Sequence, residues 1–194
     1  MDIRKERSAS LAYFYFDFRD KDKRSRHSLL LSILSQLSVQ SNLCCGILSR
    51  LYSAHDNGAR NPSDDVLKQC LKEMLSLPAP GPVYLIVDAL DECPHNSGMP
   101  TAREEVLKLI EDLVGMRLSG LHICVTGRPE IDIQTALKPL TSLCVSLHST
   151  QSGQKKDIED YVSSVVYSDT MMQRWREEDK KLVIERLSER ADGM

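Results

Sequence analysis

Apolar residues fall in short blocks along the chain, and the spacing within each block predicts either a strand or a helix. Residues 11–18 are dense in aromatic side chains, which favour strands. Their consecutive apolar positions indicate burial on both faces, as in a parallel sheet. Three further apolar blocks of strand length occupy residues 83–88, 121–126 and 142–148. We therefore predict four strands.

Apolar residues at helical spacing fill the segments between these blocks. Helices are predicted after His27, after an N-cap at Ser41 or Asn42, after Ser63, around residues 106–114, and from Pro129 to about Leu137. Strands that alternate with helices are typical of the α/β class, with a parallel sheet covered by helices on both faces, which makes three layers. Only helical patterns follow residue 148. The sequence thus predicts an α/β domain over residues 1–148 and the start of a helical subdomain over residues 149–194.

Composition narrows the class of protein. Hydrophobic residues make up 41% and charged residues 27%, as in a soluble folded chain. The net charge of −3 argues against a nucleic acid partner held by bulk charge, and no apolar run is long enough to span a membrane. The six cysteines contain no C-x-x-C pair, so we expect reduced, mostly buried thiols in a cytoplasmic protein and no zinc site.

Three acids follow the second apolar block. Asp88 is the last residue of the predicted strand, and Asp91 and Glu92 come just beyond it. Ligands of open α/β folds bind at the carboxyl edge of the sheet, where such an Asp can hold Mg²⁺ beside nucleotide phosphates. Glu92, supported by Asp91, would then orient or deprotonate an attacking water. A single Asp after a strand is also common for turn reasons alone, but three acids at this spacing favour a site.

A polar residue and an arginine lie at the end of the third block. Thr126 and Arg128 end the strand that should neighbour the acidic one. Arg128 could reach a terminal phosphate as a permanently charged, planar donor. The alternative is an exposed loop arginine that pairs with a local acid.

These motifs together resemble a NACHT domain of the signal-transduction ATPase type, in its fungal, nephrocystin-3-like N-terminal form. The residues that carry the resemblance are 85–93 (LIVDALDEC), 126–129 (TGRP), 13–20 (YFYFDFRD), 158–162 (IEDYV) and 188–194 (SERADGM). The resemblance implies a P-loop NTPase-like sheet and an ATP- or GTP-driven switch that oligomerises, in fungal non-self recognition and programmed cell death. By position it implies Asp88 as the magnesium ligand, Asp91 and Glu92 as catalytic acids, and Thr126 and Arg128 facing the nucleotide.

One part of the family pattern is absent. The phosphate loop, G-x-x-x-x-G-K-[ST], does not occur, and the chain has no Gly-Lys dipeptide. We therefore expect an incomplete sheet that lacks its first strand and phosphate loop. This would be the distal part of a switch whose partners are an upstream phosphate-loop segment and downstream helical or repeat domains of a parent protein, with possible homo-oligomers. Such a chain should not bind nucleotide alone. Whether it is an enzyme is therefore left undecided at this point, although the family it resembles contains NTPases. The other hypotheses are a non-catalytic interaction module or decoy, and an unrelated α/β binding domain.

Overall fold

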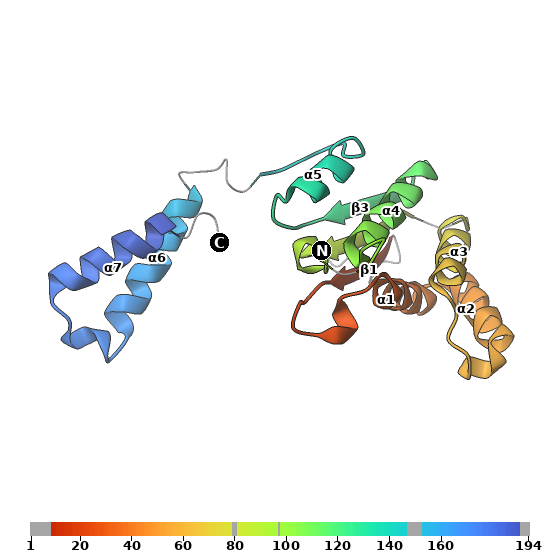
Figure 1. Ribbon diagram of the computed structural model, residues 1–194, viewed down its shortest axis with the longest axis horizontal. Helices are drawn as coiled ribbons and strands as arrows, with labels where there is room; N and C mark the ends of the chain where they lie inside the picture. The colour runs from red at the N-terminus through yellow and green to blue at the C-terminus, as the bar shows by residue number, and fades with distance from the viewer. Residues whose placement is uncertain (1–8, 79–80, 97, 147–152, 191–194) are drawn as a thin grey trace. The chain divides into compact units, whose positions relative to one another are not determined.

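The computed structural model describes residues 9–78, 81–96, 98–146 and 153–190 of the 194-residue chain. The chain divides into two compact units, Met1–Thr141 and Ser142–Met194. The first unit contains the sheet, and the second is helical (Figure 1).

A three-stranded parallel sheet forms the centre of the first unit. Its strands are β1 (Ser10–Tyr15), β2 (Val83–Asp88) and β3 (Leu121–Val125), in the order β1-β2-β3. Three of the four predicted strands are thereby confirmed within a few residues of their expected ends, and the α/β class with them. Because both pairs are parallel, the carboxyl ends of all three strands lie at one edge of the sheet.

The prediction of a fourth strand is wrong for the residues that the structure describes. Residues 142–146 form no strand, while Leu147 and His148 lie outside the described residues. Leu143 and Val145 are 78% and 73% exposed. Alternating apolar residues become a strand only where a neighbouring strand offers its peptide groups, and no described strand lies beside this segment.

The two faces of the sheet differ in burial. Ala12, Phe14 and Val87 are buried on the face that packs on the helices. Tyr13 and Tyr15 point to the opposite face and are 50% and 46% exposed. Burial of the first strand on both faces was therefore a wrong expectation, and the described part of this unit has two layers rather than three. Tyrosine tolerates this position because its ring can pack while its hydroxyl stays in water.

In the described part of this unit, five α-helices accompany the strands. They are α1 (Arg26–Ser38), α2 (Asn42–Ala54), α3 (Asp64–Leu75), α4 (Ala102–Gly115) and α5 (Ile131–Leu137). Of the two N-caps proposed for α2, Ser41 is confirmed, and Ser63 caps the helix expected after it; each hydroxyl accepts from the backbone N–H three residues on. Helix α1 packs on β1, and α2 and α3 pack on α1. The buried side chains of these helices and of the inner sheet face form one core.

The second unit is a pair of helices that contact each other, α6 (Gly153–Ser168) and α7 (Glu177–Arg190), as the helical patterns predicted. Among the described residues, no helix is both long and apolar enough to cross a membrane. All six cysteines are unpaired, but only three of them are buried, contrary to the expectation that most would be: Cys44, Cys70 and Cys93.

Candidate functional site

Asp88 and Thr126 meet where β2 and β3 end. The hydroxyl of Thr126 donates to Oδ1 of Asp88 and accepts from the backbone N–H of Ala89 at 3.1 Å. The backbone ties the same two ends together, because Thr126 donates to the carbonyl of Val87 at 2.9 Å. The predicted placement of Asp88 and Thr126 at the carboxyl edge is confirmed.

The chain turns sharply after Asp88. Ala89 has φ of 53° and ψ of 47°, which is the left-handed region that a residue with Cβ seldom adopts. The turn leads into a short 3-10 helix, η3 (Leu90–Glu92), whose first residue is fully buried and anchors it. This anchor fixes where the carboxylates of Asp91 and Glu92 point.

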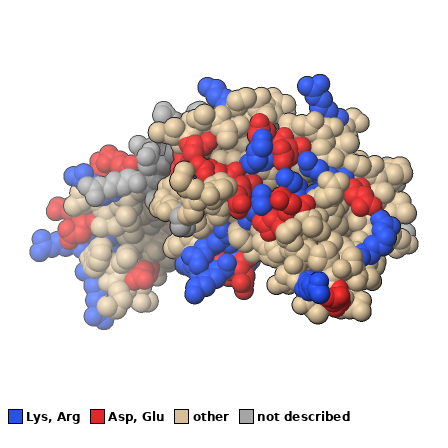
Figure 2. Space-filling model, turned by 45° about the vertical axis from the view of Figure 1, so that its right-hand side comes forward, with Lys and Arg blue, Asp and Glu red and all other residues tan. Residues whose placement is uncertain are grey.

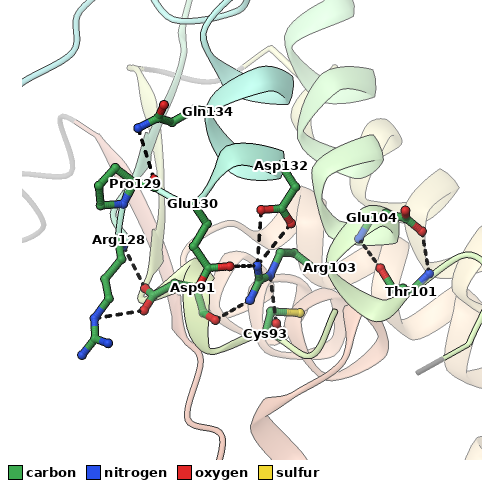
Figure 3. Close-up of polar contacts among 10 residues, drawn as sticks. All are labelled: Asp91, Cys93, Thr101, Arg103, Glu104, Arg128, Pro129, Glu130, Asp132 and Gln134. Carbon is green, nitrogen blue, oxygen red and sulfur yellow. Dashed lines mark hydrogen bonds and ion pairs between the residues drawn. The ribbon is translucent and has the colours of Figure 1, made fainter. Parts of the chain in front are cut away.

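Asp91 turns toward the loop that follows β3. Its Oδ1 accepts from the backbone N–H of Arg128 at 3.1 Å, and its Oδ2 lies 3.6 Å from Nε of Arg128 (Figure 3). The Asp91 side chain is 13% exposed and that of Arg128 is 70% exposed. A Cβ on Gly127 would lie 3.2 Å from Oδ1 of Asp91, so glycine permits this close approach. Arg128 thus lies at the expected edge, and it also pairs with a local acid.

Glu92 turns the other way, toward β1. Its Oε2 accepts from the backbone N–H of Phe18 at 3.1 Å, in the turn that follows that strand. The two neighbouring acids therefore serve different loops. Asp91 has both oxygens engaged by Arg128, whereas Glu92 has one oxygen engaged by a neutral donor. Of the two expected catalytic acids, Glu92 retains more capacity to accept a further hydrogen bond.

One buried residue at this site escaped the sequence reasoning. Arg103, on the first turn of α4, is 1% exposed and contacts both the loop after β2 and the start of α5 (Figure 3). The sequence pattern could have indicated its burial, because Arg103 lies at helical spacing from Val106, Ile110 and Leu113 and so shares their face of the helix. A charge on an apolar stripe that folds into the core needs buried partners.

The residues present match only part of a magnesium–nucleotide site. Asp88 supplies one carboxylate, and Mg²⁺ in phosphate sites commonly takes one or two carboxylates and completes its shell with water and phosphate oxygens. No group of three or more potential metal-binding side chains occurs in the described ranges. The chain offers no Gly-Lys phosphate cradle. Figure 2 shows acidic and basic side chains side by side on the face that it presents.

Comparison with known proteins assigns the chain to a family. Neither a curated protein nor a solved structure matches the chain. A family model, described as nephrocystin 3, N-terminal, matches residues 1–128, which include all three strands and the five candidate site residues. The chain belongs to the nephrocystin 3 N-terminal family.

Proposed function

We propose that this chain is the distal part of a NACHT-type nucleotide switch, in which a phosphate loop supplied by another segment holds ATP or GTP. The observation that carries the proposal is the meeting of Asp88, Thr126, Asp91 and Arg128 at one sheet edge. Asp88 would hold Mg²⁺, and when bound the metal would neutralise the phosphate charge. Thr126 orients Asp88, Glu92 accepts a proton from water, and Arg128 faces the terminal phosphate.

The same residues should not bind nucleotide unaided. Most ground-state affinity in such folds comes from the N–H groups and lysine of the phosphate loop, together with the helix dipole. Arg128 offers one charged partner, worth about 1–3 kcal/mol, while micromolar binding requires about 8 kcal/mol. Asp91 already engages that arginine, and three acids at one edge repel a polyphosphate.

Titration calorimetry tests both halves of the proposal. The 194-residue chain with Mg²⁺ and either nucleotide should give no low-micromolar dissociation constant, and such a constant would overturn the claim of dependence on another segment. A protein with a G-x-x-x-x-G-K-[ST] strand and helix fused before Met1 should bind nucleotide, unlike the same fusion with its lysine changed to alanine.

In the binding fusion, Glu92→Gln should abolish hydrolysis and spare binding, and Arg128→Ala should weaken discrimination between tri- and diphosphate. A folded fusion that binds neither nucleotide would refute the switch.

A second candidate function is a non-catalytic interaction module. Strand β3 has β2 as its one neighbour in the described part of the sheet. Gly120 and Thr126 turn their peptide groups toward β2, so Ile123 and Val125 direct theirs to the outer edge. An open edge of this kind pairs with other extended segments. Light scattering that shows a concentration-dependent oligomer of the 194-residue chain would favour this candidate, and a monomer at high concentration would count against it.

A further inference from the structure

Arg103 joins the two loops that form the candidate site. It lies on α4, but its guanidinium reaches the loop after β2, donating from Nε to the carbonyl of Cys93 at 2.9 Å and from a terminal nitrogen to that of Asp91 at 2.5 Å. The other terminal nitrogen donates to Glu130 and, at 3.2 Å, to Oδ2 of Asp132 (Figure 3). One side chain thus spans the carboxyl ends of β2 and β3.

The burial of Arg103 makes these contacts obligatory. Its side chain is 2% exposed, so water cannot replace a lost partner. Burial by itself would lower the pKa of the guanidinium, but the hydrogen bonds that it donates to Glu130 and Asp132 outweigh that effect and raise the pKa. Without the cation, Glu130 and Asp132 would repel each other at the first turn of α5, and two carbonyls would lose their donors.

We infer that Arg103 is a positioning residue. It fixes the backbone of Asp91 and so holds the carboxylate of Asp91 against Arg128. It also holds the start of α5 at a fixed position relative to the loop after β2. The importance of this for nucleotide chemistry rests on the proposed function, whereas the positioning itself does not. A lysine cannot take over, because one ammonium group lacks the planar fork that reaches acceptors on both sides.

The rest of the site agrees with this role. Helix α4 is fixed at its start by a reciprocal capping box between Thr101 and Glu104, and the N–H of Arg103 donates to the carbonyl of Pro94 at 3.0 Å. Among the described residues, by contrast, the side chain of Asp91 is held only by Arg128, whose own side chain is largely exposed. The rigid contact of Asp91 is therefore the hydrogen bond from Arg103 to the Asp91 carbonyl. The contact between the Asp91 carboxylate and Arg128 depends on that hydrogen bond.

Amide hydrogen exchange by NMR on the 194-residue chain, without nucleotide, tests the inference. In Arg103→Lys, the Arg128 amide should exchange about 10-fold faster relative to the amides of β2, because its acceptor on Asp91 is no longer held. The matched control is Leu109→Ala, a buried residue on the same helix, which should speed the β2 and Arg128 amides together.

The outcomes separate positioning from simple stability. Equal acceleration of all amides in Arg103→Lys, or wild-type exchange at Arg128, overturns the inference. Arg103→Met, which removes all of the guanidinium donors, serves as a second variant and should also loosen the Arg128 amide selectively. In a nucleotide-binding fusion, Arg103→Lys should lower kcat more than it raises KM. A fusion that never binds nucleotide would refute the proposed function and leave the exchange result standing.

Discussion

Two glutamines, Gln36 in α1 and Gln40 in the turn just after that helix, close the outer edge of β1. Gln36 accepts from the N–H of Tyr13 at 3.1 Å and donates to its carbonyl at 2.6 Å. Gln40 does the same for Leu11, at 2.9 and 2.7 Å. Four residues at helical rise span about 6 Å and two strand residues about 6.6 Å, so the end of α1 with its following turn and the strand present their groups in register. Each side-chain amide therefore replaces one residue of a neighbouring strand.

Replacing both glutamines should destabilise the first unit and expose the edge. A net hydrogen bond contributes about 0.5–1.5 kcal/mol, and these bonds are partly in water, so each glutamine stabilises by about 1–2 kcal/mol. Gln36→Met and Gln40→Met remove the amides at nearly constant side-chain length, and at position 36 also at nearly constant helix propensity. Gln69→Met, on an exposed position of α3, is the matched control and should change stability by less than about 0.5 kcal/mol.

Urea unfolding and light scattering measure the two effects. The double variant should lose about 2–4 kcal/mol if the two sites add, and it should associate more strongly because the N–H and C=O groups of Leu11 and Tyr13 become available. A double variant within about 0.5 kcal/mol of the wild type, with unchanged association, would refute the reasoning. A loss of stability in the Gln69 control of the same size would do so as well.

Three further predictions concern strain, pH and thiol reactivity. Ala89→Gly should raise the melting temperature by relieving the left-handed backbone, a gain of about 0.5–1 kcal/mol, and a lower melting temperature would contradict the strain. Partial burial would raise the pKa of Asp64, but hydrogen bonds from Arg26 and His27 outweigh it and lower the pKa. That stabilisation is present above the unfolded pKa of about 4 and is lost as the pH falls through the lower pKa of the folded state. In Asp64→Asn, the free energy of unfolding in urea should therefore fall less steeply as the pH is lowered below about 4. Burial raises the pKa of the Cys93 thiol to about 12, so mass spectrometry should find it alkylated at neutral pH only after unfolding.

The strands and the meeting of their ends could be predicted from sequence because both depend on local pattern. An apolar run that stops at Asp88 marks a strand end, and parallel pairing then brings that end beside Thr126. The pairing partners of the acids could not be predicted. Asp91 and Glu92 are adjacent in the chain, yet the left-handed turn at Ala89 and the buried Leu90 send them to opposite loops.

Other features depend on long-range packing that single positions do not reveal. Arg103 interrupts an apolar stripe, and its partners come from residues 10 to 29 positions away. The segment at 142–146 has a strand-like pattern, but a strand also requires a neighbour, and pattern alone does not supply one. The exposure of Tyr13 and Tyr15 could not be predicted either, because it depends on whether other elements cover that face of the sheet and not on the residue types in the strand.

The two edges of the sheet differ in a way that links the candidate functions. The β1 edge is occupied by side chains of its own unit, so an added strand there would have to displace four hydrogen bonds. At β3, the peptide groups of Ile123 and Val125 face outward, and the strand runs directly into Thr126 and Arg128. A segment that paired with β3 in parallel would therefore end beside the candidate site, and whatever followed it would face Asp88. Strand addition along the side of β3 and completion of the site would then be one event, because the carboxyl end of the added strand would lie at the same carboxyl edge as the site.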